Sequence, residues 1–376
     1  MAVPFLDQAT TIEVVNPEFR TVVENGSIEH LPDYLDQEGL ASDHAFIITD
    51  TIVEALYGEA VTGTLSAAGI EPTIITMQAG EKNKTWETVG SFVERLSGQN
   101  TARSDTIIAL GGGVVGDLGG FVASIYKRGI PLVHVPTTLL AMVDSSVGGK
   151  TGVDHGGKNM TGSFYQPRLV VADPTVLSTL SQRVYTEGFG EIAKYGMLDA
   201  DFLPELEAVA GDLRIYSDEQ ASVLGQIIAR CVKQKSDVIA ADPFEDPENS
   251  SGRILLNYGH TLCHALEAAG GFTELLHGEG VSIGMNFAAK FAVALGFAEE
   301  ELVERQADLL QSLGLPLLYE GEATVDEVMG HIAKDKKNLG SGETRFVFPQ
   351  SPGQMLVRKI GNTTVETAVA EFLSAA

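Results

Sequence analysis

The sequence has few cysteines and few basic residues, and each shortage excludes a class of proteins. It contains two cysteines, Cys231 and Cys263, which are too few for a disulfide framework, so we expect both to be reduced. Lys and Arg number 25 against 51 Asp and Glu, and the resulting net charge of -26 disfavours nucleic acid and anionic membranes as partners. No apolar run approaches the length that spans a bilayer, and residues 1–18 lack the basic and apolar segments of a signal peptide. The sequence therefore predicts a cytoplasmic protein.

The composition is otherwise that of an ordinary globular protein, with 44% hydrophobic and 20% charged residues, and the length of 376 residues favours two domains. In the first half, strand-length apolar runs alternate with helical patterns, which is typical of a largely parallel α/β sheet. The runs are 45–49, 73–76, 106–110, 132–135 and 169–171. Longer helical periodicities follow at 219–238, 259–269, 281–295 and 300–313. We expect an α/β domain with a mostly parallel sheet over 1–180 and an all-α domain over 181–376.

A glycine-rich segment after the run 106–110 has the pattern of a dinucleotide-binding loop. Gly111, Gly113 and Gly116 precede a helical pattern, and such a loop lets backbone N–H groups approach a pyrophosphate at a helix N-terminus. Glycine-rich turns after strands are also common, and no acidic residue ends the next strand to hold a ribose. If NAD binds here, Asp50, which follows an earlier strand, is the candidate for that contact.

Histidines and a carboxylate recur in the second half in the numbers that a metal site requires. His260 and His264 stand four positions apart and so share one face of a helix, an arrangement that is more often structural than metal-binding. His277 follows in a second turn, and Glu191 lies in a predicted helix over 188–196. Two histidines and one carboxylate leave one position of a zinc ion open for substrate. A catalytic metal site is therefore one interpretation, and a structural histidine pair is the other.

Basic residues, scarce overall, gather in short segments that contain glycine, asparagine or aspartate. Loops such as 144–150 and 157–159 bind phosphate through backbone N–H groups and ammonium charge, although an ordinary surface loop is the alternative. An acidic protein that acts on an anionic substrate must concentrate its positive charge at the site. The candidates for this role are Lys84, Arg128, Lys150, Lys158, Lys235, Arg253, Lys336 and Lys337.

Ten short segments, taken in order, resemble the dehydroquinate synthases over residues 40–350. No single segment decides the matter, but their joint order is highly specific. They are GEKNK at 80–84, GGGVVGD at 111–117, RG at 128–129, VPTTLLA at 135–141, DSSVGGKT at 144–151, GSFYQP at 162–167, GEIAKYG at 190–196, LNYGHTLCH at 256–264, HGE at 277–279 and KDKK at 334–337.

The resemblance implies an N-terminal NAD-binding α/β domain, a C-terminal helical metal-binding domain and a homodimer. It implies that a zinc or cobalt ion is held by Glu191, His260 and His277. It implies that NAD is held by Asp50, Glu81, Lys84, Gly112, Gly113, Val114, Asp117, Thr137, Thr138, Lys158 and Thr179. The substrate's phosphate and carboxylate fall to Lys150, Asn159, Lys235, Arg253 and Lys336. The resemblance also places near the reacting groups Asn257, His264, Lys194 and Asp144, and it has Arg128 reach the phosphate of the other subunit's substrate.

The reaction implied by the resemblance converts 3-deoxy-D-arabino-heptulosonate 7-phosphate to 3-dehydroquinate and phosphate, by transient NAD oxidation, phosphate elimination, re-reduction and aldol closure. Another sugar-phosphate cyclase, of the epi-valiolone or 2-deoxy-scyllo-inosose synthase type, is expected to differ at Asn257 and His264. A metal-dependent polyol dehydrogenase would have little use for Lys150, Arg253 and Lys336. A catalytically inactive regulatory protein is disfavoured by the complete set of ligands and cations.

Overall fold

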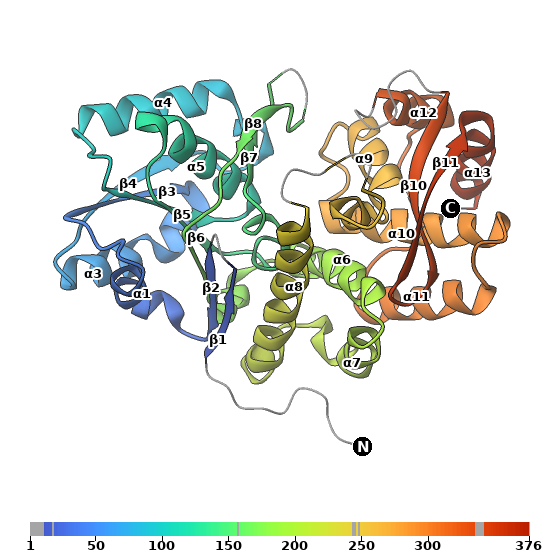
Figure 1. Ribbon diagram of the computed structural model, residues 1–376, viewed down its shortest axis with the longest axis horizontal. Helices are drawn as coiled ribbons and strands as arrows, with labels where there is room; N and C mark the ends of the chain where they lie inside the picture. The colour runs from blue at the N-terminus through green and yellow to red at the C-terminus, as the bar shows by residue number, and fades with distance from the viewer. Residues whose placement is uncertain are drawn as a thin grey trace. The chain divides into compact units, whose positions relative to one another are not determined.

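The computed structural model describes residues 11–16, 19–155, 158–242, 246, 249–334 and 342–375. The chain divides into two compact units (Figure 1). One, called here the sheet unit, contains Asp7–Leu180 and Ser217–Asp237, and the other, called the helical unit, contains Ser181–Tyr216 and Val238–Ala376. Segment 217–237 thus belongs to the sheet unit, although it lies in the half of the chain where we expected the second domain. Within the described ranges, no helix is both long enough and apolar enough to cross a membrane.

The sheet unit is built on a seven-stranded sheet in which every pairing is parallel except that of the edge pair β1 and β2, which confirms the expected mostly parallel sheet. Three interior strands, 106–111, 132–136 and 169–172, are buried along their whole length, as their uninterrupted apolar runs require. In sheet order the strands are β1 (Thr11–Val15), β2 (Arg20–Glu24), β9 (Leu169–Ala172), β6 (Leu132–Pro136), β5 (Thr106–Gly111), β3 (His44–Asp50) and β4 (Glu71–Met77).

The order of these strands reverses between β3 and β5. The chain runs from β3 outward to β4 on one side, then returns to β5 on the other side of β3 and continues to β6. Such a switch point opens a crevice at the carboxyl ends of the strands, where ligands bind in open α/β sheets. In Figure 1 the sheet lies between two layers of helices. Their bounds are α1 (Leu31–Gln37) and α3 (Glu59–Ala67) on one face, and α4 (Trp86–Gly98) and α5 (Gly113–Ile125) on the other.

The second unit is mainly helical, as expected, but it also contains an antiparallel pair of strands that the expectation of an all-α domain omitted. In this pair Phe346 and Phe348 are buried and pack against the aromatic rings of Phe287 and Phe291, in a cluster that also contains Phe372. Packing against these distant rings thus buries the apolar run of the strand pair. The elements are α6 (Gln182–Leu198), α7 (Phe202–Val209), α9 (His260–Ala269), α10 (His277–Ala294), α11 (Glu300–Ser312), α12 (Val325–Lys334), α13 (Asn362–Ser374), β10 (Glu343–Ser351) and β11 (Gln354–Gly361).

Two crossings in the helical unit depend on glycine. A Cβ atom on Gly190 would lie 2.3 Å from the carbonyl oxygen of Gly278, so the backbones of α6 and α10 are in contact at this point. A Cβ atom on Gly284 would lie 1.9 Å from the carbonyl oxygen of Gly259, so α10 also touches the residue that precedes α9. Three of these glycines adjoin a predicted metal ligand in the sequence. The crossings therefore set the distances between the three ligands.

The buried histidine of the sheet gives a testable pH dependence of stability. His134 in β6 is 4% exposed, and burial lowers its pKa from 6.5 to about 4. Between these pH values the unfolded chain binds a proton that the folded chain does not, so stability is lost as the pH falls. We expect this group to remove up to about 3 kcal/mol from the free energy of unfolding across that window.

Denaturant titrations at neutral pH and about pH 5 should show a smaller loss of unfolding free energy in His134→Gln than in the unchanged protein. The exposed His44 supplies the control, and equal pH slopes for His134→Gln, His44→Gln and the unchanged protein would contradict the assignment.

Candidate functional site

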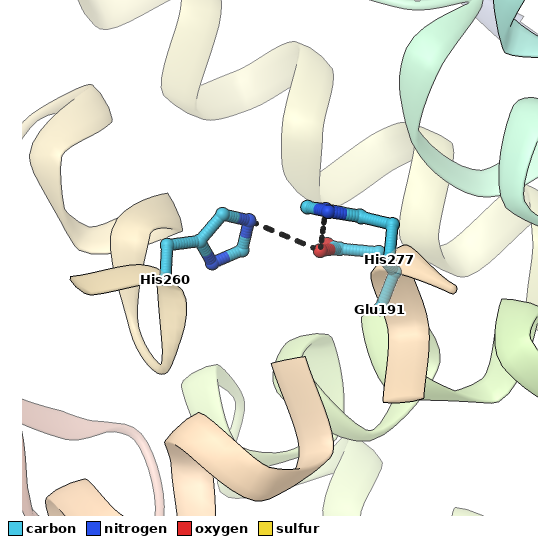
Figure 2. Close-up of side chains that lie close together, drawn as sticks. All are labelled: Glu191, His260 and His277. Atoms are coloured by element: carbon cyan, nitrogen blue, oxygen red, sulfur yellow. Dashed lines mark ion pairs between the residues drawn. The ribbon is translucent and has the colours of Figure 1, made fainter. Parts of the chain in front are cut away.

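Three side chains from three helices meet in the helical unit (Figure 2). Glu191 lies in α6, His260 begins α9, and His277 begins α10. Nε2 of His260 lies 3.2 Å from Oε1 of Glu191, and Nε2 of His277 lies 3.5 Å from the same oxygen. One ligand atom from each residue falls within 4.8 Å of the others, a spacing that a single metal ion can bridge. We call these residues the metal triad.

The side chain of Glu191 is negatively charged, as a carboxylate ligand of a metal cation must be. Its side chain is fully buried and contacts the ammonium of Lys194 through Oε2. Burial alone would raise the pKa of Glu191, but Lys194 and His260 outweigh burial and hold the pKa well below its usual value. Among the described residues, neither carboxylate oxygen has a hydrogen bond of normal geometry. A buried, ionised carboxylate of this kind fits a metal ligand better than a structural acid.

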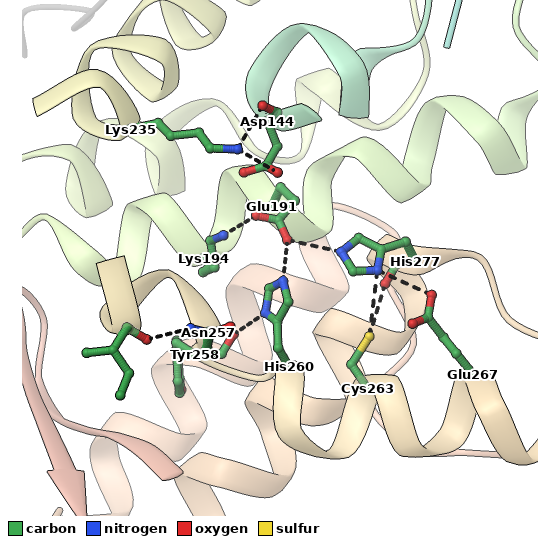
Figure 3. Close-up of polar contacts among 11 residues, drawn as sticks. Asp144, Glu191, Lys194, Lys235, Asn257, Tyr258, His260, Cys263, Glu267 and His277 are labelled. Atoms are coloured by element: carbon green, nitrogen blue, oxygen red, sulfur yellow. Dashed lines mark hydrogen bonds and ion pairs between the residues drawn. The ribbon is translucent and has the colours of Figure 1, made fainter. Parts of the chain in front are cut away.

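Both imidazole rings of the metal triad turn Nε2 toward Glu191 because a neighbour accepts a hydrogen bond on the other side (Figure 3). The backbone oxygen of Tyr258 lies 2.9 Å from Nδ1 of His260, and Oε1 of Glu267 lies 3.3 Å from Nδ1 of His277. Burial lowers the pKa of His260 and keeps its ring neutral. Burial alone would lower the pKa of His277, but contacts with Cys263, Glu191 and Glu267 outweigh burial and raise it well above its usual value, so metal binding would displace a proton from this ring. Two imidazole nitrogens and one carboxylate oxygen match the ligand set of a catalytic zinc or cobalt site, with a position left for substrate.

His264 lies beside the metal triad without belonging to it. Its ring centroid is 5.3 Å from that of His260 and 6.1 Å from that of His277. It lines a pocket together with Ile254, Asn257, His260, Thr261, Arg345 and Val347. His260 therefore contacts Glu191 and also lines the pocket, whereas His264 lines the pocket without joining the metal triad.

Three further residues near the site, Thr261, Glu267 and Arg345, are not among those predicted from the sequence. Thr261 and Glu267 lie in α9, the helix that carries His260, so helical spacing offered a weak signal. Arg345 lies in β10, a strand that the sequence analysis did not predict. No local signal in the sequence would have placed Arg345 at the pocket.

In the sheet unit, the residues predicted to bind NAD follow adjacent strands at the switch point. Asp50 ends β3, Gly112 precedes α5 directly after β5, and Thr137 follows β6. Oδ1 of Asp50 accepts hydrogen bonds from the backbone N–H groups of Ile52 and Val53, at 2.8 and 3.1 Å, and so caps a helical turn. These positions share the carboxyl edge of a parallel sheet, where a dinucleotide is expected to lie.

The glycine loop packs closely against neighbouring side chains at the start of α5. A Cβ atom on Gly112 would lie 3.2 Å from Cγ2 of Thr138, and one on Gly113 would lie 3.1 Å from Oγ of Ser145. Val114 follows in the first turn of the helix, whose N–H groups have no partner within the helix. Glycine at these positions therefore lets a pyrophosphate approach the backbone and the positive end of the helix dipole.

Lys84 joins residues that lie far apart in the sequence. Its Nζ atom lies 2.6 Å from Oδ2 of Asp117, 3.9 Å from Oε1 of Glu81 and 2.5 Å from Oδ1 of Asn159. Burial alone would lower the pKa of Lys84, but the carboxylates of Asp117 and Glu81 raise it. The ammonium is therefore charged, and it links the predicted NAD residues to Asn159, which was predicted to bind substrate.

Asp144 and Lys235, each a predicted site residue, form an ion pair in this unit. Nζ of Lys235, in α8 (Ala221–Ala241), lies 2.9 Å from Oδ2 of Asp144 and donates to its backbone oxygen at 2.8 Å (Figure 3). Thr179, another predicted NAD residue, shares a hydrogen bond of 2.7 Å with the hydroxyl of Tyr57. Tertiary structure thus brings these pairs together from distant parts of the chain.

The remaining predicted residues lie at separate positions. Lys150 begins β7 (Lys150–Val153) and is exposed, and Lys158 lies in the turn before β8 (Thr161–Phe164). Arg128 is exposed on a turn with a positive φ of 65°, and Arg253, 3% exposed, begins the short helix η9 (Arg253–Asn257). Lys336 and Lys337 lie outside the described residues.

Comparisons with known proteins identify the family of the chain. The N-terminal 3-dehydroquinate synthase family matches residues 74–187, and the C-terminal 3-dehydroquinate synthase family matches residues 188–338. A 3-dehydroquinate synthase of Picosynechococcus is 38% identical over 355 residues, which cover 94% of this chain and 95% of the relative. These matches confirm the resemblance read from the sequence.

Two solved structures extend the comparison to the fold. A 2-deoxy-scyllo-inosose synthase, complexed with carbaglucose-6-phosphate, NAD+ and Co2+, has a TM-score of 0.86 at 26% identity, covering 97% of this chain and 100% of that chain. A 2-epi-5-epi-valiolone synthase from Streptomyces hygroscopicus, with NAD+ and Zn2+ bound, has a TM-score of 0.83 at 27% identity, covering 98% and 100%. Because both family models match in order and the relative aligns over nearly its whole length, the chain belongs to the 3-dehydroquinate synthase family.

Proposed function

We propose that this chain converts 3-deoxy-D-arabino-heptulosonate 7-phosphate to 3-dehydroquinate and inorganic phosphate with the residues assigned below. One observation carries the proposal: His260 is both a member of the metal triad and a wall of the pocket that contains Asn257, His264 and Arg345. A small polar substrate that bound beside these residues would meet a metal, a basic group and hydrogen-bonding groups. The 38% identity to a 3-dehydroquinate synthase over 94% of the chain supports this substrate.

NAD and a divalent metal serve this reaction, and the described residues suit both. We assign NAD to Asp50, the glycine loop and Thr137 and Thr138 at the switch point, and the metal to the metal triad. Bound NAD would supply reversible hydride transfer at the C5 alcohol of the substrate, and a bound metal would supply Lewis-acid polarisation of that oxygen. The chain's own task is to hold these groups in place and to manage charge and protons.

We assign basic residues of this chain to bind the two anionic groups of the substrate. Lys150, Lys235 and Arg253 are the proposed partners of its phosphate and carboxylate, together with Asn159 and with Lys336, which lies outside the described residues. Guanidinium and ammonium groups form strong, charge-assisted hydrogen bonds to such oxygens. In a chain of net charge -26, these cations also offset a repulsive surface field.

We assign proton transfer to a residue that lines the pocket. Oxidation at C5 makes the neighbouring C6 proton acidic, this proton leaves as phosphate departs, and the opened ring later closes by an intramolecular aldol reaction. His264 is the proposed proton shuttle, since it lines the pocket without joining the metal triad. Asn257, whose Nδ2 donates to the backbone oxygen of Ile254 at 3.1 Å, is proposed to orient the substrate. Lys194 and Asp144 are assigned to charge balance near the reacting groups.

We further propose a cytoplasmic homodimer. Arg128 is exposed on a turn whose positive φ is uncommon for a residue other than glycine. Such a side chain is suited to reach a phosphate held by a partner subunit. The net charge of -26 argues against nucleic acid and membrane as partners.

The proposal predicts that NAD is needed only in catalytic amount. With NAD at a small fraction of the substrate concentration, we expect one phosphate released for each heptulosonate phosphate consumed and no accumulation of NADH. The reason is that the hydride returns to the substrate in every cycle. Phosphate release and NADH absorbance, followed in the same reaction, provide the measurement. NADH formed in proportion to product, or formed from polyols without phosphate release, would refute the cyclase and favour a dehydrogenase.

A further inference from the structure

We infer that Glu267 is a positioning residue that orients and polarises His277 for metal binding. It lies in α9, the same helix as His260, and its side chain is 3% exposed. Its Oε1 atom lies 3.3 Å from Nδ1 of His277, on the side of the ring opposite to Glu191 (Figure 3). The ring of His277 therefore stands between two carboxylates, of which only Glu191 belongs to the metal triad.

The hydrogen-bonding groups around His277 define which ring nitrogen carries the proton. An ionised carboxylate only accepts hydrogen bonds, so the contact with Glu267 places a proton on Nδ1. Nε2, which lies 3.5 Å from Oε1 of Glu191, is then the nitrogen that offers its lone pair when a metal binds. Cys263 adds only weak contacts, with Sγ at 3.9 Å from Nδ1 of His277 and at 3.7 Å from its backbone oxygen.

The two histidines of the metal triad differ in the group that accepts a hydrogen bond from Nδ1. This difference is the reason why we expect Glu267 to strengthen metal binding by His277. His260 donates to a neutral backbone oxygen, that of Tyr258, at 2.9 Å. His277 instead faces a buried negative charge, which makes its ring a stronger electron donor and adds attraction for a divalent cation. Outer carboxylates of this kind change metal affinity by about 10- to 100-fold in metalloproteins.

The backbone at His277 is fixed independently of Glu267. Oε2 of Glu279 accepts a hydrogen bond from the backbone N–H of Leu276 at 2.9 Å and so caps the start of α10. The guanidinium of Arg183 binds both carboxylate oxygens of Glu279, each at 2.7 Å. A substitution of Glu267 should therefore release the ring of His277 while the helix start stays in place.

The inference rests on the proposed metal triad. It is tested by measuring metal affinity, which does not depend on catalytic activity. The metal-free chain would be titrated with Zn2+ or Co2+ in competition with a chromophoric chelator. Glu267→Gln, which keeps size and shape but removes the charge, is expected to weaken binding about 10- to 100-fold. The control Glu274→Gln removes an exposed carboxylate that accepts a hydrogen bond from Tyr319, and Cys263→Ser removes the weak thiol contact. Both should bind within about threefold of the unchanged chain.

The outcomes separate the positioning role from the metal triad itself. If the unchanged chain binds one metal and His277→Ala binds none, while Glu267→Gln binds as tightly as the unchanged chain, the positioning role is wrong and the triad stands. If the unchanged chain binds no metal, the triad is wrong as well. Two metals per chain, one of them lost in Cys263→Ser, would instead make Cys263, Glu267 and His277 a second site and overturn the inference.

A measurement on the unchanged chain keeps the inference testable if Glu267→Gln does not fold. In the metal-loaded protein with 15N-labelled histidine, long-range proton–nitrogen spectra report which ring nitrogen carries hydrogen. We expect His277 to carry its proton on Nδ1, and His277→Ala identifies its signals. A proton on Nε2, with Nδ1 unprotonated, would contradict the role of Glu267.

Discussion

Replacing His260 or His277 by alanine is expected to abolish metal binding and to lower kcat/KM by about three orders of magnitude. Each ring supplies one of three ligand atoms that lie within 4.8 Å of one another, and loss of the Lewis acid costs several kcal/mol of transition-state stabilisation. His264→Ala should retain the metal, because its ring lies outside the metal triad, while losing activity as a proton shuttle. Elemental analysis of each purified variant, beside its phosphate-release rate, provides the measurement.

Metal removal gives the matching control for these variants. Prolonged dialysis against a chelator should stop phosphate release by the unchanged enzyme, and zinc or cobalt should restore it. His260→Ala and His277→Ala should not recover under the same treatment. Full activity without metal would show that the metal triad is structural, and equal metal loss in all three histidine variants would mean that His264 is also a ligand.

Arg253→Ala is expected to lower kcat/KM about a hundredfold while metal and NAD remain bound. A charge-assisted hydrogen bond contributes about 1.5 to 3 kcal/mol, and the 3% exposure of Arg253 places its contacts away from screening water, toward the upper end of that range. The backbone N–H of Arg253 donates to Oδ2 of Asp242 at 2.9 Å, and this bond survives the substitution. The loss should therefore appear in the kinetics of phosphate release more than in unfolding.

An exposed arginine in the same unit provides the control for Arg253. Arg358 lies in β11, and its Nη1 atom donates to the backbone oxygen of the neighbouring Val357 at 2.9 Å. It is preferable to Arg305, which forms an ion pair with Glu207 and would change a second interaction. Arg358→Ala should leave kcat/KM nearly unchanged. If Arg253→Ala and Arg358→Ala behaved alike, Arg253 would have to be removed from the substrate site.

Local pattern was enough to predict most of the sheet unit. Its strands are short buried runs separated by helical segments, and the glycine loop follows one of them, so periodicity alone indicated a parallel sheet with a dinucleotide loop. Periodicity could not indicate β10, because the apolar run around Phe346 and Phe348 is short and the rings it packs against lie far away in the chain. The expected all-α domain was incomplete for that reason.

The sequence by itself determined the residue types of the site: the glycines, two histidines and a carboxylate, and scarce cations held in a few segments. Spacing also showed that His260 and His264 share a helix face, but not which of them faces a carboxylate. Tertiary structure decided that point, because the close helix crossings at Gly278 and Gly284 place Nε2 of His260 and His277 against Glu191. It likewise decided the contacts of Glu267 with His277 and of Lys84 with Asn159. Local sequence determines which face of a helix is polar, whereas long-range packing determines what that face meets.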